Sequence, residues 1–319
     1  MISDKQLISF APLQGFTDHT FRQAFHNHFG GVDAYYTPFI RTENDKSIKN
    51  SKLRDVLPEN NSNLPLIPQL LVNSASDFIQ ISSLFENFGY KEINWNLGCP
   101  YPMVAKHQLG SGLLPYPELI NQILSEVLPK IKAEISIKMR LGYENPDEIF
   151  EVLSVLNNFP IKEIIIHARI GKQMYKGSTN LNAFEDCQNQ TKHKIGYNGD
   201  IDNIETFKNI SSRFENIKHF MIGRALISNP FLAEEIKGIE QNTKKIKIFE
   251  AFHNELYEKY ASTLSGSTHL QNKMMFFWEY FADSFSNSKK VFKRIKKANN
   301  IDNFNAAIIE NLKNEDWIK

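Results

Sequence analysis

The sequence is short of cysteine, of long apolar runs and of net charge. Its 319 residues include two cysteines, Cys99 and Cys187, which are too few for a disulfide framework and fit a reducing compartment. No apolar run approaches the roughly 20 residues that span a bilayer. The N-terminal apolar run stops at Pro12, too early for a signal peptide. We therefore expect a cytoplasmic protein with no membrane partner.

The net charge of +1 excludes no class of partner, but the charges are unevenly distributed. The residues before Glu240 include 24 basic and 26 acidic ones, whereas those from Glu240 onward include 13 basic and 10 acidic ones. The C-terminal part is therefore the basic part. No group of His, Asp or Glu has metal-ligand spacing, so we expect no metal.

Eight short apolar, β-branched runs recur along the chain, and most are followed by a stretch with helical spacing. This alternation favours parallel strands, and eight strands close a barrel. The main rival is an open doubly wound sheet, but no GxGxxG follows the first strand. The expected strands are Leu7–Ala11, Asp33–Thr37, Leu66–Leu71, Glu92–Asn96, Ile135–Met139, Glu163–His167, Lys194–Asn198 and His219–Ile222.

The alternation stops after about Lys237, and the remaining segments have helical spacing only. The sequence therefore predicts an α/β protein: a (β/α)8 TIM barrel over residues 1–240, followed by a C-terminal helical bundle over 241–319. The expected tail helices are Ile246–Leu264, Asn272–Phe285, Asn287–Asn299 and Asn303–Leu312.

Cys99 lies in the run Asn96-Leu97-Gly98-Cys99-Pro100, at the turn that ends the fourth strand. In a parallel barrel the chemistry sits on the loops that follow the strands. A buried structural cysteine normally lies within an apolar element, not on its turn. Cys99 alone leaves a reactive and a structural role equally open.

The other strand ends also carry polar or special residues, which would all face the same end of one barrel. Each has an ordinary explanation by itself, such as a turn or a satisfied structural group. The candidates outside the Cys99 turn are Pro12, Leu13, Gln69, Lys138, Arg140, His167, Arg169, Asn198, Gly199, Asp200, Gly223 and Arg224.

Gly199 and the Gly223-Arg224 pair follow the seventh and eighth strands, where this fold commonly binds phosphate. Backbone N–H groups at a helix start bind anions, and a guanidinium adds two-pronged hydrogen bonds. We expect a phosphorylated ligand, and flavin mononucleotide (FMN) is a large one that would fill the barrel mouth. Lys138 would then place positive charge near the reduced ring, and Gln69 and Asn96 would read its polar edge.

Taken together, these segments resemble the flavin-dependent tRNA-dihydrouridine synthases over essentially the full length of the chain. Leu13 departs from the methionine usual in that family, and the tail is most similar to the C-type bacterial members. The motifs are Ala11-Pro12-Leu13-Gln14-Gly15-Phe16-Thr17-Asp18 with Phe21-Arg22, Asn96–Pro100, Gly110-Ser111-Gly112-Leu113-Leu114, Lys138-Met139-Arg140, His167-Ala168-Arg169 with Tyr175, Asn198-Gly199-Asp200-Ile201 and Gly223-Arg224-Ala225.

The resemblance implies reduction of the C5=C6 bond of a D-loop uridine in tRNA, with bound FMN as hydride donor and NADPH as reductant. The subtype likeness favours uridine 16. Because that bond is conjugated with the C4 carbonyl, hydride enters at C6 and a proton must then reach C5. A thiol with an ordinary pKa of about 8.5 still holds its proton at neutral pH. Cys99 is therefore expected to be the general acid.

The resemblance also assigns contacts to the remaining candidates. We expect Pro12, Leu13, Gln69, Lys138, His167, Asn198, Asp200, Gly223 and Arg224 to bind FMN. We expect Asn96, Arg140, Arg169 and Tyr175 to lie near the substrate base.

A basic surface is predicted on the helix Ser288–Asn299. Its six Lys and Arg side chains cover an arc of about 160° on a helical wheel, opposite an apolar arc of about 120°. A solvated face over a buried stripe is the ordinary explanation, whereas contact with phosphates suits a basic domain. We expect Lys289, Lys293, Arg294 and Lys297 to contact tRNA.

Three other functions stay open. The chain could be an FMN-dependent reductase of a small molecule, a non-catalytic RNA-binding barrel protein, or a non-redox phosphate-binding barrel. No obligate protein partner is indicated, and we expect a monomer.

Overall fold

The computed structural model describes residues 6–43 and 47–319. Residues 1–5, over which no signal peptide is expected, lie outside that range. Contacts between residues divide the chain into two compact units. We call them the barrel unit (residues 6–12 and Ala34–Ile222) and the helical unit (Leu13–Asp33 and Gly223–Lys319). Within the described ranges no helix is both long and apolar enough to cross a membrane.

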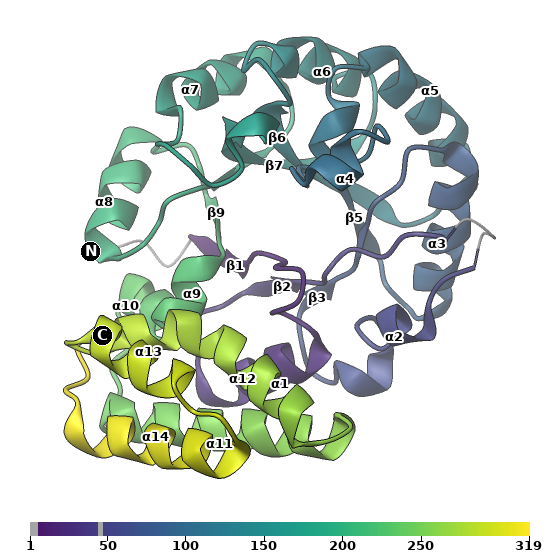
Figure 1. Cartoon of the computed structure of the whole chain (residues 1–319). Coiled ribbons are helices and arrows are strands. Elements are labelled where there is room, and N and C mark those ends of the chain that lie inside the picture. Colours follow the sequence, from purple (N-terminus) through teal and green to yellow (C-terminus); the bar gives the residue numbers. More distant parts are fainter. Residues whose placement is uncertain (1–5, 44–46) are drawn as a thin grey trace. The chain divides into compact units, whose positions relative to one another are not determined.

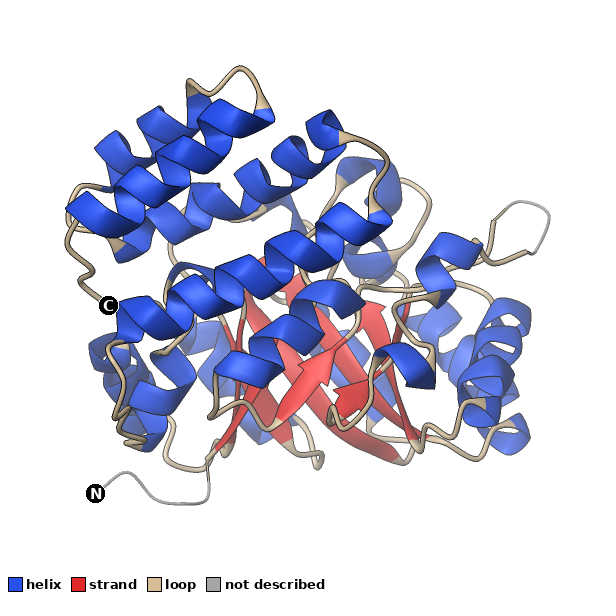
Figure 2. Ribbon diagram, turned by 90° about the horizontal axis from the view of Figure 1, so that it is seen from below, coloured by secondary structure: helices blue, strands red, loops and turns tan. Residues whose placement is uncertain are grey.

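The barrel unit is a ring of parallel strands, which Figure 1 shows end-on and Figure 2 shows from the side. The predicted (β/α)8 barrel is confirmed. The strands are β1 (Leu7–Phe10), β2 (Ala34–Tyr36), β3 (Leu66–Ile67), β4 (Gln69–Leu70), β5 (Glu92–Leu97), β6 (Glu134–Gly142), β7 (Ile161–Ile170), β8 (Ile195–Asn198) and β9 (His219–Ile222).

Pro68 explains why nine strands make an eight-membered ring. β3 pairs with β2, whereas β4 pairs with β5 and forms a single bridge to Ile40, so β3 and β4 are halves of the third predicted strand. Proline has no N–H to donate to a ladder, which interrupts pairing at that point. Its carbonyl still accepts the Asn94 N–H at 2.9 Å, so the ring continues through the proline.

Helices cover the outside of the ring because each buries one apolar stripe against the strands. In α5 the buried residues are Ile120, Ile123, Leu124 and Val127, at helical spacing. Trp95 of β5 points outward and meets Phe78 of α3 edge to face at 5.4 Å. The helices of this unit are α2 (Asn50–Leu53), α3 (Ala75–Asn87), α4 (Pro102–Ala105), α5 (Pro117–Val127), α6 (Glu148–Leu156), α7 (Leu181–Gln190) and α8 (Ile204–Arg213).

The inside of the ring has an apolar layer and a polar one. Ala11, Tyr36, Ile165 and Met221 form a buried cluster. Nearer the N-terminal ends of the strands lies a network of Ser9, His219 and Glu163. The His219 ring bonds Ser9 Oγ at 2.6 Å and Glu163 Oε2 at 2.8 Å. These groups fill the ring, so polar chemistry is left to the opposite end of the strands.

The helical unit has an aromatic core. Phe21 of α1 stacks on Phe277 of α12 with ring centroids 5.1 Å apart, and Phe252 of α11 meets Phe21 edge-on at 5.9 Å. α12 begins at Ser267, five residues before the predicted start, after Gly266 at φ +87°. The helices are α1 (His19–His28), α9 (Arg224–Ser228), α10 (Leu232–Lys237), α11 (Lys245–Thr263), α12 (Ser267–Phe281), α13 (Ser288–Lys296) and α14 (Ile301–Asn314).

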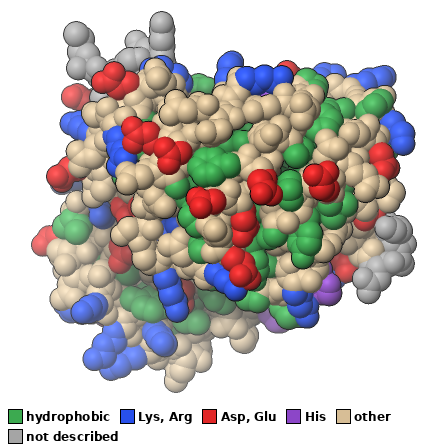
Figure 3. Space-filling model, turned by 90° about the horizontal axis from the view of Figure 1, so that it is seen from above, with side chains coloured by type: hydrophobic (Ala, Val, Ile, Leu, Met, Phe, Trp, Pro, Cys, Tyr) green, Lys and Arg blue, Asp and Glu red, His purple; other side chains and the backbone are tan. Residues whose placement is uncertain are grey.

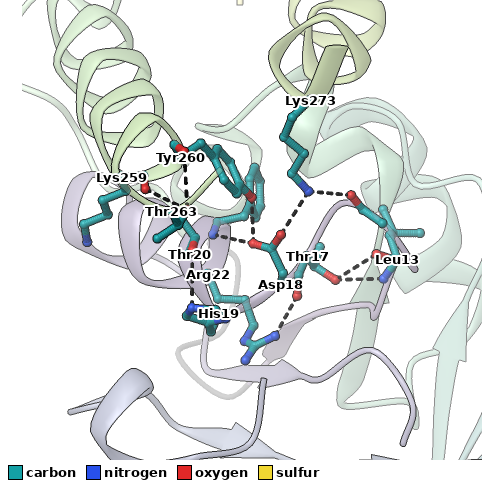
Figure 4. Close-up of polar contacts among 12 residues, drawn as sticks. Leu13, Thr17, Asp18, His19, Thr20, Arg22, Lys259, Tyr260, Thr263 and Lys273 are labelled. Atoms are coloured by element: carbon teal, nitrogen blue, oxygen red, sulfur yellow. Dashed lines mark hydrogen bonds and ion pairs between the residues drawn. The ribbon is translucent and has the colours of Figure 1, made fainter. Parts of the chain in front are cut away.

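Asp18 joins three helices of this unit (Figure 4). It caps α1, because its Oδ1 accepts the Phe21 N–H at 3.0 Å, and the same oxygen accepts the Tyr260 hydroxyl at 2.6 Å. Lys273 Nζ donates to Asp18 Oδ2 at 2.9 Å and to the Gly15 carbonyl at 2.8 Å. The predicted boundary at residue 241 separates a catalytic from an RNA-binding domain by function. That division stays a prediction, and the helical unit also includes α1, α9 and α10.

Candidate active site

The turn that carries Cys99 is held by the side chain of Asn96. Asn96 Oδ1 accepts the N–H groups of Gly98 and Cys99, each at 2.9 Å. Its Nδ2 donates to Gln69 Oε1 at 2.7 Å. This asparagine therefore fixes the direction in which the chain leaves β5. Its predicted contact with the substrate base stays a prediction.

A second segment, the 3-10 helix Gly110–Leu113, covers the Cys99 turn from the other side. The N–H and the Oγ of Ser111 both donate to the Cys99 carbonyl at 3.0 Å. Gly110 has φ +58°, and a Cβ there would lie 2.6 Å from Cys99 O and 2.7 Å from Cys99 Cβ. Only glycine fits this position, which explains the first residue of the motif Gly110–Leu114.

Cys99 is a buried thiol, 8% exposed. Burial raises its pKa, and the backbone N–H of Tyr101 and the charges of Arg140 and Lys138 oppose that rise. The net direction is upward, so the sulfur keeps its proton at neutral pH. A protonated thiol beside two cations suits proton donation to a carbanion better than nucleophilic attack.

Lys138 and Arg140 lie at alternate positions of β6 and therefore face the same side. Lys138 Nζ donates to Asn198 Oδ1 at 3.0 Å, and Asn198 Nδ2 donates to the Met221 carbonyl at 2.7 Å. Burial, and next the charge of Arg140, lower the pKa of Lys138 to about 7. This side chain therefore changes charge within the physiological range.

Arg140 is fully buried and connects two loops. Its Nε donates to the Gly98 carbonyl at 3.1 Å, and its Nη1 donates to the Ile170 carbonyl at 2.8 Å. The guanidinium carbon lies 5.4 Å from the ring centroid of Tyr175. Burial lowers its pKa to about 10, so the group stays charged at neutral pH. The structure thus brings Arg140 and Tyr175 together, as their shared assignment requires.

Arg169 and Asp200 form a buried two-pronged ion pair. Nη1 and Nη2 of Arg169 lie 2.7 and 2.5 Å from the two carboxylate oxygens of Asp200. Nη2 also donates to the Gly177 carbonyl, and Nη1 lies 3.3 Å from His167 Nε2. A predicted cofactor contact and a predicted substrate contact therefore bind each other. Their roles toward ligands stay predictions.

A chain of buried side-chain hydrogen bonds connects Gln69 of β4 to β5 and, through β5, to β6. Gln69 Nε2 donates to Asn94 Oδ1 at 2.8 Å, and Asn94 Nδ2 donates to Ser136 Oγ at 3.0 Å. Asn94, Ser136 and Ser111 were not among the predicted site residues, although Ser111 belongs to the motif Gly110–Leu114. The sequence did carry a signal for Asn94 and Ser136, because side chains two residues apart on a strand face the same side. Asn94 lies two residues before Asn96, and Ser136 lies two residues before Lys138.

The remaining predicted FMN contacts are Pro12, Leu13, Gly223 and Arg224. Pro12 follows β1 in the barrel unit, and both Leu13 and Arg224 belong to the helical unit, together with Gly223 at the N-cap of α9. Their predicted FMN contacts stay predictions. Among the residues that the structure describes, His, Cys, Asp and Glu form no group of three that could hold a metal.

On α13 the predicted basic residues differ in their pairing. Arg294 bonds to the Asn311 side chain and lies 2.9 Å from Glu310 and 3.3 Å from Glu315, so its charge is matched within the unit. The exposed side chains of Lys289, Lys293 and Lys297 make no ion pair with any described residue. The burial of Val291 and Ile295 confirms the apolar stripe beneath them.

The outer helices of the barrel unit have the opposite charge. α5, α6 and α7 contain no Lys or Arg. Figure 3 shows acidic side chains gathered on this face. Exposed acids on or next to these helices include Glu118, Glu126, Asp147, Glu151 and Asp186. A polyanion would be repelled from this face.

The fold and the site define a class: a parallel (β/α)8 barrel whose strand ends hold a protonated thiol, a titrating lysine and buried amides. A family model described as "Dihydrouridine synthase (Dus)" matches residues 9–315. The chain belongs to the dihydrouridine synthase family.

Two relatives and one solved structure illustrate the likeness. A tRNA-dihydrouridine(16) synthase of Neisseria meningitidis is 28% identical over 74% of this chain and 72% of its own length. One of Pseudomonas putida is 29% identical over 72% of each chain. The structure of an old yellow enzyme from Trypanosoma cruzi aligns with a TM-score of 0.52 and 10% identity, over 77% of this chain and 91% of that one. The last match shows the fold alone.

Proposed function

We propose that this protein reduces the C5=C6 bond of a uridine in tRNA to dihydrouridine, with FMN as the bound cofactor and NADPH as the reductant. The observation that carries the proposal is the Cys99 thiol. It is buried and protonated, held by Asn96 and Ser111, and influenced by the charges of Lys138 and Arg140. Family membership supports the reaction, and the relatives named for uridine 16 make that position the first to test.

The residues at the strand ends fit a flavin. The lowered pKa of Lys138 reflects a buried ammonium that a nearby anion would stabilise. The buried Arg169 Nε has no hydrogen-bond partner among the described residues, so a polar acceptor would satisfy it. Lys138, His167 and Asn198 are three of the nine residues that we assign to the cofactor. When bound, a flavin supplies the hydride that this chemistry requires.

The chain's own residues then have separate tasks. Cys99 holds a proton on Sγ for delivery to C5 of the base, and the resulting thiolate is favoured by Arg140 and Lys138. Asn96 and Ser111 hold the turn so that the sulfur keeps its position. Arg140 and Tyr175, on the same side as the thiol, are assigned to the edge of the base.

RNA binding is assigned to charge instead of sequence readout. The lysines of α13 that make no ion pair supply contacts to phosphates, and the acidic side chains on the outer surface of α5–α7 disfavour RNA on that surface. The target uridine must leave its stack to reach a buried thiol.

The test uses purified protein and tRNA that lacks dihydrouridine. We expect bound flavin in the visible spectrum, bleaching on addition of NADPH, and a gain of two hydrogens at one D-loop uridine by mass spectrometry. A colourless protein, or tRNA whose mass does not change, would refute the proposal. Reduction of free uridine at the same efficiency as tRNA would favour a small-molecule reductase.

A further inference from the structure

A groove lies beside the Cys99 turn, in the part of the barrel unit that follows β5 and β6. Its volume is about 710 Å³, within the range of pockets that hold small organic ligands. The residues that matter here are Lys106, His107 and Gln108 from the segment after α4, Tyr116 at the start of α5, and Tyr143 and Asn145 from the loop after β6.

The groove shares a wall with the candidate active site. Ala105 of α4 and Gly112 of the 3-10 helix Gly110–Leu113 line it. A Cβ on Gly112 would lie 2.2 Å from the Ala105 carbonyl oxygen, so these two segments of the wall are in close contact. The adjacent Ser111 bonds the Cys99 carbonyl through two donors. A molecule in the groove is therefore separated from Cys99 by one layer of backbone.

The groove leaves two nitrogen-bearing side chains open to a ligand. Of its two acidic residues, Glu148 is held by the N–H groups of Tyr143, Glu144 and Asn145, which donate to it at 2.7, 3.1 and 2.9 Å. Glu144 pairs with Lys172 at 2.6 Å. The exposed Lys106 and His107 make no ion pair with a described residue, so their nitrogens can donate to a phosphate.

The rest of the lining suits a nucleobase. Tyr116 is 44% exposed and Tyr143 is half-buried, so each offers ring surface for stacking. The side-chain amides of Gln108 and Asn145 can donate to and accept from a base edge. The backbone of Gln108 adopts a left-handed conformation, with φ +54°.

From these observations we propose that the groove binds a nucleotide flanking the target uridine, which rests on the proposed function. The base stacks on Tyr116, the more exposed of the two rings, and Lys106 and His107 contact its phosphate. A flanking nucleotide is joined to the target by one phosphate, which matches a groove one wall away from Cys99. The groove thus reads the surroundings of the uridine and contributes to the choice of position.

The test measures tRNA binding directly, without turnover. We expect Tyr116→Ala to raise the Kd for tRNA about ten-fold, the loss that removing one stacking ring produces. Tyr116→Phe keeps the ring and should bind as the wild type does. Lys106→Ala should raise the Kd several-fold, whereas Lys130→Ala, an exposed lysine before β6, should not.

A second measurement identifies the occupant. A tRNA that is abasic at the 5′ or the 3′ neighbour of the target should bind the wild type more weakly than intact tRNA does. It should bind Tyr116→Ala with the same Kd as intact tRNA, because the abasic site and the substitution remove the same contact. Additive losses, or a wild-type Kd for both Tyr116→Ala and Lys106→Ala, would overturn the proposal. So would a raised KM for NADPH with an unchanged Kd for tRNA, which would make this a reductant site.

The outcome is separable from that of the proposed function. If the wild type binds tRNA without forming dihydrouridine, the reaction is refuted while the binding comparison still decides the role of the groove.

Discussion

At the scale of single residues, the chemistry depends on how protons are held. Burial raises the pKa of Cys99 and keeps the thiol protonated, whereas burial together with the charge of Arg140 lowers the pKa of Lys138 to about 7. The two effects are opposite in consequence, since one retains a proton and the other releases it. A thiol that stays protonated beside a cation that titrates near pH 7 gives the site its pH response.

The two cysteines allow a matched comparison. We expect Cys99→Ala to keep bound flavin and NADPH oxidation while lowering dihydrouridine formation at least about 100-fold, because general-acid catalysis contributes about that much or more. Cys187 is also buried, on α7, where its Sγ donates to the Ala183 carbonyl. Cys187→Ala should therefore keep its rate. Single-turnover assays on unmodified tRNA measure both, and an unimpaired Cys99→Ala would remove the thiol from the mechanism.

Lys138 should make FMN affinity depend on pH. Its charged form decreases as pH rises through about 7, so attraction to an anionic ligand weakens in that direction. We expect Lys138→Met to raise the Kd for FMN about ten-fold at about pH 6 and to have less effect at about pH 8. Titration of the apoprotein by flavin fluorescence measures this. Lys132→Met, at an exposed position before β6, is the control and should follow the wild type. An equal effect at both pH values would contradict the titration.

At the scale of elements, α13 offers unpaired charge on one face and a buried stripe on the other. We expect the triple variant Lys289→Glu, Lys293→Glu, Lys297→Glu to raise the Kd for tRNA and to reduce the slope of log Kd against log salt by about 2 to 3, since each phosphate contact contributes somewhat less than one. The control triple Lys130→Glu, Lys132→Glu, Lys192→Glu makes the same change in net charge on the barrel unit. Equal losses in both would mean that α13 acts only through net charge.

The elements also show how far the sequence could be interpreted. β9 has the predicted bounds His219–Ile222, because a short apolar run between polar segments is a local signal. α7 has only a weak signal in the sequence, because its buried residues are Ala183, Phe184 and Cys187, too few for a clear periodic stripe. The pairing of Arg294 with Glu310 and Glu315 was also out of reach, since a helical wheel of α13 contains no information about α14.

The candidate site shows the same difference between local signals, which the sequence carries, and contacts between distant segments, which it does not. The strand-end positions of the barrel unit could be predicted, because a parallel barrel places the carboxyl ends of its strands at one end. The partners could not. Ser111 holds Cys99 across twelve residues, and Asp200 meets Arg169 across thirty-one, through contacts that only the folded ring creates.

At the scale of the whole molecule, the buried histidine of the helical unit should set the acid limit of stability. His253 accepts the indole N–H of Trp278 at 3.2 Å, which requires an unprotonated Nε2. Burial lowers its pKa to about 4.

Between about pH 6.5 and about pH 4 the unfolded chain therefore binds a proton that the folded chain does not. We expect stability to fall by up to about 3 kcal/mol as pH decreases across that window. His253→Gln, which does not titrate, should show a flatter profile. Denaturant unfolding followed by tryptophan fluorescence measures the difference. Parallel profiles would exclude this histidine as the cause.

Pro68 also has a consequence for motion. The ladders on either side of it are among the shortest in the ring, since β3 and β4 have two residues each, whereas β6 and β7 pair along most of their lengths. Few bonds need to open there for water to reach the amides. In hydrogen–deuterium exchange, the third strand should therefore take up deuterium before β6 and β7. Local opening of the barrel wall would then start at the strand that the proline interrupts.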